Sequence, residues 1–434
     1  MKMKAIVLLC VLLLVVDLHG QQRQPAQVAS SDSGVSSDRL ARLDKVLQDH
    51  VDQERIAGVV ALVLRDGRPI YERAFGWRDK EASRPMTTDT IFRIASQTKA
   101  LTSAAILALM EEGALTLNTP ASHFVPGFAK TQVISKEENG ATTVPARRAI
   151  TIKDLLTHTA GISYGTDSTV AAQYEAKGLG PAAGFGWYTA DKDEGTCDTM
   201  ERLASLPFVA QPGEAYVYGY STDVLGCIVE RASGMPLDQF IVKRITQPLG
   251  MKDTHFFLPA ADRDRLAVVY SSGPDDRIVR APEGARGQGH YVEGPRKNFS
   301  GGAGLVSTAR DYARFLETIR LGGALHGSRI LSPRTVALMT TNQSGTLHST
   351  AGLGFGLGFE TVDRYGAHSL SSVGSFRWGG AYGSTYLVDP EARLVLVFMM
   401  QLLPSRTDLA QKFPTLVYQA LTEPLKGAGN ALSR

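Results

Sequence analysis

Strand-like runs stand near both ends of this chain, and a long region of helices and loops separates them. Near the start, residues 59–64 and 69–76 are rich in Val, Leu, Tyr and Phe, and Asp66-Gly67 between them is typical of a hairpin turn. Near the end, residues 384–388 and 394–400 are again strand-like. We therefore expect an α+β fold, in which one antiparallel sheet is built from both chain ends around an inserted helical region.

Helical patterns occupy much of the remaining chain. Apolar residues recur at helical spacing over residues 40–51, and residues 100–110, 152–156 and 408–421 are also helix-like. Residues 163–197 are polar and rich in glycine, which predicts a long loop or insertion. A long irregular segment in a compact domain is often functional, so this one is a candidate roof for a pocket, although its placement stays open.

These patterns predict two structural parts with their boundaries. Residues 38–95 and 296–434 are expected to form a sheet-and-helix domain, and residues 96–295 a mostly helical domain with long loops. A cleft between two such lobes is a common place for a binding pocket.

The N-terminus predicts export. Lys2 and Lys4 precede an apolar run over residues 5–16, and polar residues follow, as in a secretory signal peptide that ends near residue 20. Residues 21–37 are rich in Gln, Ser and Pro, which predicts a disordered leader. We expect the mature chain to be periplasmic or extracellular and to carry no membrane span, while the cleavage point stays open.

Charge and cysteine content exclude several classes of protein. The 434 residues include 46 Lys and Arg against 43 Asp and Glu, a net charge of +3, which gives no electrostatic case for nucleic acid binding. Three cysteines are too few for a disulfide scaffold and have no zinc-site spacing, and we expect no metal or other cofactor. After signal removal Cys197 and Cys227 remain, either as a pair or as two thiols.

Ser96-Gln97-Thr98-Lys99 is the sharpest local motif. It opens the predicted helix 100–110, and a Ser-x-x-Lys there places both side chains on one face, one turn apart. A serine needs a nearby base to become a nucleophile, and a buried lysine can provide one. The first turn of a helix also offers free N–H groups to an oxyanion. The alternative, an N-cap serine followed by a solvated lysine, is common for so short a pattern.

Two further segments carry groups that suit such chemistry. Tyr218 and Tyr220 follow a Pro-Gly turn, and a phenol near a cation can shuttle a proton, although tyrosines beside a turn more often only anchor a loop. Trp378-Gly379-Gly380-Ala381 precedes a predicted strand, and adjacent glycines let a substrate or another backbone approach closely. A β-bulge beside a buried tryptophan is the alternative for this segment.

A competing motif is Gly161-Ile162-Ser163-Tyr164-Gly165, which fits the G-x-S-x-G of α/β-hydrolases. That motif requires a strand before the serine and a helix after it. Here a helical stretch precedes Ser163 and a long loop is predicted to follow, and His158 stands before the serine instead of after it. We therefore do not expect Ser163 to be the nucleophile.

Together, the Ser96–Lys99, Tyr218–Tyr220 and Trp378–Ala381 segments resemble the serine β-lactamase and penicillin-binding-protein superfamily. The resemblance is to its class C β-lactamase-like branch and especially to the family VIII carboxylesterases. It extends from about residue 40 to the last helix and includes the phrases 155–162, 248–254 and 300–309. It implies an α+β domain with an all-helical insertion, in agreement with the predicted lobes.

The resemblance also implies roles for individual residues. Ser96 matches the acylated nucleophile, Lys99 its activating partner and Tyr218 the proton-shuttling tyrosine, and without a class A-type glutamate motif we expect Tyr218 with Lys99 to activate the deacylating water. Tyr220 occupies the position of an asparagine that recognises amides. The N–H groups of Ser96 and Ala381 match the oxyanion hole.

Trp378-Gly379-Gly380 falls on the family's Lys-Thr-Gly motif, which shapes the substrate expectation. A lysine offers positive charge to a substrate carboxylate, whereas tryptophan offers an apolar wall and one N–H donor. Arg377 is adjacent, but neighbouring side chains on a strand point to opposite faces, so it is not expected to replace that lysine. A neutral or aromatic ester suits this pocket better than an anionic lactam.

The sequence thus predicts a secreted serine hydrolase that cleaves small carboxylic esters with short acyl or aromatic groups, through an acyl-enzyme on Ser96. One alternative keeps the same Ser/Lys/Tyr chemistry but acts on a β-lactam or a D-amino-acid peptide. Acyl transfer to an alcohol or amine is another, and a non-catalytic binding protein on the same fold is more remote. The natural substrate and the oligomeric state stay open.

Overall fold

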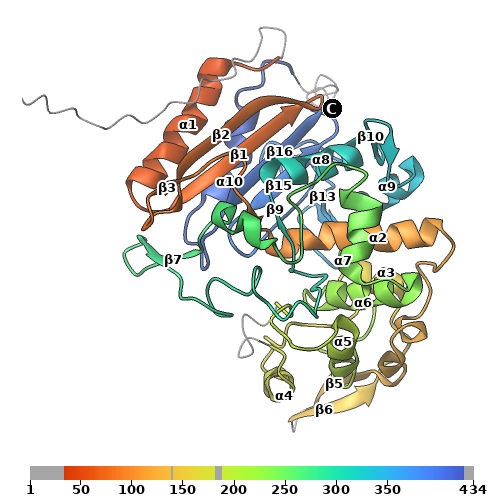
Figure 1. Cartoon of the computed structure of the whole chain (residues 1–434). Coiled ribbons are helices and arrows are strands. Elements are labelled where there is room, and N and C mark those ends of the chain that lie inside the picture. The colour runs from red at the N-terminus through yellow and green to blue at the C-terminus, as the bar shows by residue number, and fades with distance from the viewer. Residues whose placement is uncertain (1–33, 138–139, 181–187, 425–434) are drawn as a thin grey trace, which may run out of the picture.

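The computed structural model describes residues 34–137, 140–180 and 188–424, in which one large sheet stands beside a group of helices (Figure 1). The predicted signal peptide lies outside the described residues, as does the predicted leader up to residue 33. Residues 34–37 are described: Val35 forms a β-bridge with Leu421, and Ser36 caps the first helix. No helix within the described ranges is long and apolar enough to cross a membrane.

The sheet has eight antiparallel strands in the order β12-β13-β14-β15-β16-β1-β2-β3, which confirms the prediction of one sheet from both chain ends. Its strands are β1 (Gly58–Arg65), β2 (Arg68–Asp79), β3 (Arg84–Pro85), β12 (Leu353–Phe355), β13 (Glu360–Val362), β14 (Phe376–Gly379), β15 (Thr385–Asp389) and β16 (Leu394–Met400). β1 and β16, from opposite ends of the sequence, pair in the centre over seven residues. The hairpin turn is the predicted one, since Asp66 and Gly67 both have positive φ, as a tight two-residue turn requires.

Helices cover both faces of the sheet. On one face α1 (Ser37–Asp52) and α10 (Leu409–Tyr418) share a core with alternate residues of the central strands, such as Ala61 and Leu396. On the other face α8 (Ala309–Arg320) packs against the residues in between, such as Leu62 and Val397. Because helices cover both faces, the central strands are buried on both sides. Their sequences are almost continuously apolar for this reason.

The middle of the chain supplies most of the remaining helices, and α9 follows α8 in the last third. These helices are α2 (Thr98–Glu111), α3 (Ile152–Leu156), α4 (Ala171–Ala176), α5 (Thr196–Ala204), α6 (Ser221–Ser233), α7 (Leu237–Ile241) and α9 (Pro333–Met339). α2 is buried nearly all round, and the core that encloses it is continuous with the α8 face of the sheet. The expected boundaries between two domains, after residues 95 and 295, stay a prediction.

Short hairpins were not expected in the middle of the chain. β5 (Gln132–Glu137) pairs with β6 (Gly140–Pro145), and β7 (Tyr270–Ser272) pairs with β8 (Ile278–Arg280). Two further two-stranded pairs join β4 (Phe92–Arg93) to β9 (Val306–Ser307) and β10 (Ala324–Leu325) to β11 (Ser328–Arg329). The β4–β9 pair matters most, because it leads the chain directly to Ser96.

Candidate active site

Ser96 lies in a single 3-10 turn, Ala95–Gln97, that runs straight into α2. Ala95 has a φ of 43°, a left-handed conformation that costs a non-glycine residue free energy and is found disproportionately at functional sites. This turn places Ser96 at the amino end of a helix, where N–H groups lack helical acceptors. One turn later, the Lys99 Nζ donates a hydrogen bond of 3.2 Å to the Ser96 Oγ. The two residues of the motif are therefore in direct contact.

Lys99 is almost completely buried, with 2% of its surface exposed. Besides Ser96, its Nζ donates to the Tyr164 hydroxyl at 2.9 Å and to the Gly302 carbonyl at 2.8 Å. All three acceptors are neutral. A buried amine that contacts a serine hydroxyl is suited to accept a proton from it.

Tyr218 approaches Lys99 with its ring rather than its hydroxyl. The Lys99 Nζ lies 4.7 Å from the centre of the Tyr218 ring, and the Trp378 Nε1 donates a hydrogen bond of 3.3 Å to the Tyr218 hydroxyl. Among the described residues, no hydrogen bond joins the Tyr218 hydroxyl to Ser96 or Lys99. The indole N–H therefore holds the phenol at the side of the Ser–Lys pair, and the predicted shuttle role of Tyr218 stays a prediction.

Tyr164 is the residue that the sequence analysis missed. It belongs to the same Gly161–Gly165 segment that was considered only for Ser163, yet its hydroxyl is the phenol bonded to Lys99. Burial, and next the neighbouring Tyr218, hold the pKa of Tyr164 well above its usual value, so the phenol stays protonated. No local pattern indicates this contact, because it depends on how the loop after α3 packs against α2.

Tyr220 is buried beneath Tyr164, with 1% exposed, and the two rings meet edge to face at 4.8 Å. Its hydroxyl accepts a hydrogen bond of 3.1 Å from the Gly180 N–H. This placement makes Tyr220 a support for Tyr164 and for the loop that contains Gly180. Its predicted contact with substrate stays a prediction.

The end of β14 lies directly beside the nucleophile turn. A Cβ at Gly380 would come within 2.5 Å of the Ile94 carbonyl oxygen, so a glycine is required for this approach, as the paired glycines indicated. The Gly380 N–H is occupied by the Ser384 carbonyl at 2.8 Å. The Ala381 N–H, in contrast, makes no hydrogen bond within the part of the chain that the structure describes. The oxyanion role of Ala381 stays a prediction.

Aromatic rings form one wall of the site. This aromatic wall consists of Tyr216, Tyr218, His348, Phe355 and Trp378. Phe355 sits at its centre, with ring centres 5.3 Å from both Tyr216 and Trp378. The wall offers apolar and π surface, and its five residues include no lysine or arginine.

His158 packs behind this wall, 4.8 Å from Tyr218 between ring centres. Burial, helped by the charge of Lys99, holds the pKa of His158 well below its usual value. His158 is therefore neutral and adds no second positive charge to the site.

Arg377 and Trp378 are neighbours on β14, where successive side chains alternate between the two faces of a sheet. Arg377 forms an ion pair with Glu360 on β13, and the same carboxylate contacts the His348 Nε2 at 2.8 Å. Burial favours a higher pKa for Glu360, but the hydrogen bond with His348 and the charge of Arg377 outweigh it, so that the net pKa is lowered. The guanidinium of Arg377 is therefore bound to the Glu360 carboxylate.

This arrangement predicts a pH-dependent contribution of Glu360 to stability. A carboxyl with a lowered folded-state pKa stabilises the protein fully above its unfolded value of about 4.3, and this contribution is lost as pH falls through the folded-state pKa. We expect the difference in unfolding free energy between the wild type and Glu360→Gln to be constant from about pH 7 to pH 5 and to shrink below about pH 4. Urea titrations at a series of pH values measure it. The exposed Glu391→Gln is the control, and a difference that is independent of pH would refute the explanation.

Ser163 is 4% exposed, and its Oγ accepts a hydrogen bond of 3.0 Å from the Gly165 N–H within its own turn. The chain enters this turn from the short helix α3 through a loop, and the next helix, α4, begins only at Ala171. The strand–serine–helix elbow that G-x-S-x-G chemistry needs is therefore not formed here.

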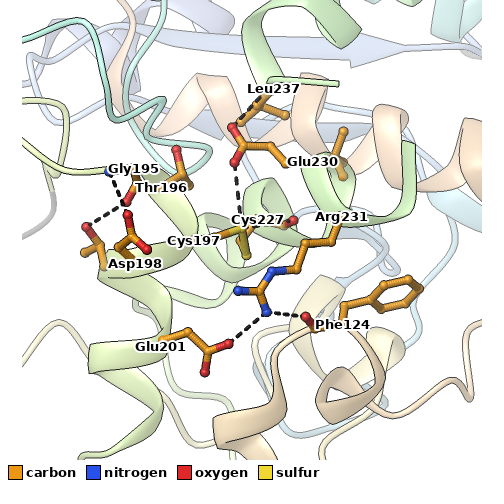
Figure 2. Close-up of a disulfide and its surroundings, with 12 residues drawn as sticks. Phe124, Gly195, Thr196, Cys197, Asp198, Glu201, Cys227, Glu230, Arg231 and Leu237 are labelled. Atoms are coloured by element: carbon orange, nitrogen blue, oxygen red, sulfur yellow. Dashed lines mark hydrogen bonds and ion pairs between the residues drawn. A yellow bond between two sulfur atoms is a disulfide. The ribbon is translucent and has the colours of Figure 1, made fainter. Parts of the chain in front are cut away.

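Cys197 and Cys227, which the sequence left open, form a disulfide in the structure (Figure 2). The bond joins α5 to α6, and Figure 2 also shows Arg231 of α6 paired with Glu201 of α5, at 2.8 Å. α6 begins at Ser221, directly after the segment of Tyr218 and Tyr220. The disulfide thus anchors the helix that carries one side of the candidate site. In the residues that the structure covers, no cluster of His, Cys, Asp and Glu could hold a metal ion.

The fold and this site define a class: α+β proteins with a Ser-x-x-Lys pair at the start of a buried helix beside an antiparallel sheet. The chain belongs to the beta-lactamase family, whose model matches residues 43–420. It is 35% identical to esterase EstB of Burkholderia gladioli over 364 residues, which cover 80% of this chain and 87% of EstB.

Solved structures of similar proteins share the fold of this chain. The structure of EstCE1, described as a hydrolase with promiscuous acyltransferase activity, matches with a TM-score of 0.74 at 29% identity, over 89% of this chain and 99% of EstCE1. The simvastatin synthase LovD from Aspergillus terreus matches with a TM-score of 0.72 at 25% identity, over 89% of this chain and 98% of LovD. These similarities confirm the predicted family and the predicted α+β fold.

Proposed function

We propose that this chain is a serine carboxylesterase that cleaves small esters through an acyl-enzyme on Ser96. The observation that carries the proposal is the 3.2 Å contact between the Lys99 Nζ and the Ser96 Oγ, beside an aromatic wall where the family's lysine would stand. The similarity to esterase EstB supports the same function.

The proposed acylation step uses groups already in contact. Lys99 in its amine form, with the Tyr218 phenol beside it, accepts the Ser96 proton as the Oγ attacks the ester carbonyl carbon. The N–H groups of Ser96 and Ala381 stabilise the negative oxygen of the tetrahedral intermediate. As the intermediate collapses, the bond to the alkoxy group breaks, and the departing alcohol takes back the proton.

Deacylation repeats these proton transfers with water as the nucleophile. Tyr218 and Lys99 remove a proton from the water as it attacks the acyl carbon, the bond to the Ser96 Oγ breaks, and Ser96 recovers its proton while the carboxylic acid leaves. We propose that Tyr220, Trp378, Gly379 and Gly380 shape the substrate pocket, with Gly379 and Gly380 allowing close approach.

Short-chain or aromatic esters are the proposed substrates. The aromatic wall favours neutral, flat or apolar groups, and Arg377 is bound to Glu360 and so unavailable to a substrate carboxylate. The test is a comparison of kcat/KM for p-nitrophenyl butyrate and for nitrocefin. The proposal requires a strong preference for the ester, and efficient nitrocefin turnover would favour the alternative, a β-lactamase or D-amino-acid peptidase with the same chemistry.

Acyl transfer to an alcohol or amine is a second candidate function. It is favoured by EstCE1, whose description includes acyltransferase activity, and by LovD, which is described as a synthase. Adding an alcohol to the ester assay separates the two, since a transferase forms a new ester faster than it releases free acid. A non-catalytic binding protein would show neither product.

We also propose that the chain is exported after removal of the signal peptide near residue 20. The predicted signal lies outside the described residues, but the Cys197–Cys227 disulfide supports the proposal, since disulfides persist mainly in oxidising compartments such as the periplasm. A mature N-terminus read from secreted or periplasmic protein tests it.

Trp378→Lys tests the proposed basis of substrate choice. Placing a cation beside the pocket should strengthen the contact with an anionic lactam by about 1.5 kcal/mol, so we expect penicillin acylation to rise about tenfold relative to ester turnover. The matched control is Trp378→Phe, which keeps an aromatic side chain without adding charge, although its ring is smaller and lacks the N–H bonded to Tyr218. If Trp378→Lys gains no lactam reactivity over Trp378→Phe, Trp378 does not select against anionic substrates.

A further inference from the structure

When Lys99 holds a proton, it is a buried ammonium without a direct ion pair. Its 2% exposure leaves almost no contact with solvent, and its three hydrogen-bond acceptors are the Ser96 hydroxyl, the Tyr164 hydroxyl and the Gly302 carbonyl. Within the described residues no carboxylate pairs with it directly. A buried charge that has only neutral ligands is costly unless an opposite charge lies nearby.

The loop Ser300–Gly302 is clamped between two helices. On one side α2 holds it, because Lys99 donates to the Gly302 carbonyl and Thr102, one turn further along, donates to the Gly301 carbonyl at 2.8 Å. On the other side α6 holds it through Asp223. The Asp223 Oδ1 accepts hydrogen bonds from the Ser300 hydroxyl at 2.7 Å and from the Gly302 N–H at 3.0 Å.

Asp223 and this loop are packed too closely for any side chain between them. A Cβ at Gly302 would lie 2.4 Å from the Asp223 Oδ2, so the glycine lets the carboxylate come against the same residue whose carbonyl binds Lys99. Asp223 itself is 0% exposed, and its Oδ2 has no hydrogen-bond partner among the described residues. A buried carboxylate oxygen without a hydrogen bond is costly in free energy unless a positive charge lies nearby.

The electrostatics of the two groups are linked. Burial raises the pKa of Asp223, and the positive charge of Lys99 is the strongest influence that opposes the rise, followed by the hydrogen bond from Ser300. The same attraction must act on the ammonium of Lys99 with equal magnitude, since a Coulomb interaction is mutual.

We propose that Asp223 is a positioning residue for the Ser96–Lys99 pair, which holds the Ser300–Gly302 loop against Lys99 and supplies the negative charge that balances its ammonium. This inference rests on the proposed esterase function of the same site. Asp223 touches neither Ser96 nor the proposed substrate position, and it acts only through Lys99 and the loop.

Other titratable groups also face Lys99, and their charges have to be compared with that of Asp223. The Tyr164 hydroxyl and the Tyr218 ring contact it, and the neutral His158 feels its charge. The tyrosines that surround Tyr164 are Tyr216, Tyr218 and Tyr220. None of these groups carries a negative charge at neutral pH in its ordinary state, so Asp223 is the group whose removal changes the field at Lys99 most.

Asp223→Asn in the mature protein is the test, because it keeps the shape and removes the charge. Without the carboxylate, the Lys99 ammonium is less stabilised and loses its proton more easily. We expect the acid limb of the pH profile of kcat/KM for p-nitrophenyl butyrate to move to lower pH by about one unit. We also expect kcat at the optimum to fall about tenfold, because the amide cannot accept both hydrogen bonds equally well.

Two further variants keep the test decisive. Ser300→Ala leaves the carboxylate and its charge in place but removes one of the two donors that hold the loop against Asp223, so kcat should fall while the acid limb stays where it is. Asp238→Asn on α7 is the matched control, since burial also raises the pKa of Asp238 and its Oδ1 also lacks a partner among the described residues. It should leave the profile unchanged.

The outcomes separate this inference from the proposed function. A wild type that shows no ester turnover refutes the proposed function itself. An active wild type whose acid limb stays in place in Asp223→Asn, or whose kcat is unchanged in Ser300→Ala, overturns the role of Asp223 alone. A limb that moves in Asp223→Asn but not in Asp238→Asn, together with a lower kcat in Ser300→Ala, confirms it.

Discussion

Ser96→Ala is expected to abolish ester hydrolysis, lowering kcat for p-nitrophenyl butyrate by about 10⁴-fold or more. The reason is that alanine removes the hydroxyl that contacts Lys99 and that is proposed to carry the acyl group. The proposed oxyanion donors, which are backbone N–H groups, remain, so a small residual rate above water is expected. Initial rates at saturating ester, with the fold checked by circular dichroism, measure the effect.

Ser163→Ala is the matched control for this substitution. Ser163 has a buried hydroxyl in a G-x-S-x-G sequence, and its Oγ is hydrogen-bonded to Gly165 within its own turn. It should keep kcat within about threefold of the wild type, as expected for a residue outside the chemistry. If Ser163→Ala loses activity and Ser96→Ala keeps it, the assignment of the nucleophile is wrong.

Loss of the Cys197–Cys227 disulfide is expected to have the largest effect on stability. The bond closes a loop with a sequence separation of 30 residues. For a loop of that length, the entropy of the unfolded chain implies a loss of about 3 to 4 kcal/mol in unfolding free energy. For a protein of this size, that corresponds to a decrease of about 4 °C in Tm. Thermal unfolding of the Cys197→Ser/Cys227→Ser double variant measures it.

The wild type in dithiothreitol is the control for this experiment. Reduction should lower its Tm to that of the double variant, and dithiothreitol should leave the double variant unchanged. Kinetics should change little at 25 °C, because α6 is also held to α5 by the Arg231–Glu201 ion pair. If reduction does not alter the wild-type Tm, the disulfide does not stabilise the fold.

The adjacent strands β15, β16, β1 and β2 of the sheet could be predicted because their signals are local and strong. Asp66-Gly67 specifies a tight turn, and residues 394–400 are continuously apolar because both faces of β16 are covered by helices. The hairpins β5–β6 and β7–β8 could not be predicted. β7 and β8 have only three residues each, and β5 and β6 are partly polar and lack the two-residue alternation that would separate them from loops. α4 lies within the predicted long loop 163–197 and is only one and a half turns long.

The Ser96–Lys99 pair could be predicted because both residues lie on one helical turn, where spacing fixes their proximity. Residues that reach the site through tertiary packing were not found in the same way. Tyr164 contacts Lys99 directly, whereas Asp223 contacts the loop Ser300–Gly302 that binds Lys99. Both arrangements form only when the segments that carry these residues pack against α2. Family resemblance pointed to Tyr218, but the bond from Trp378 to its hydroxyl is specific to this geometry.

The most direct test of the central claim is to identify the residue that becomes acylated. Purified protein would be mixed briefly with a short-chain p-nitrophenyl ester and quenched in acid. Intact-protein mass spectrometry would then measure the added mass, and peptide mass spectrometry would locate the modified residue. The proposed function predicts the mass of one acyl group on the peptide that contains Ser96, and none in Ser96→Ala. An acyl group on Ser163, or ester turnover that survives in Ser96→Ala, would contradict it.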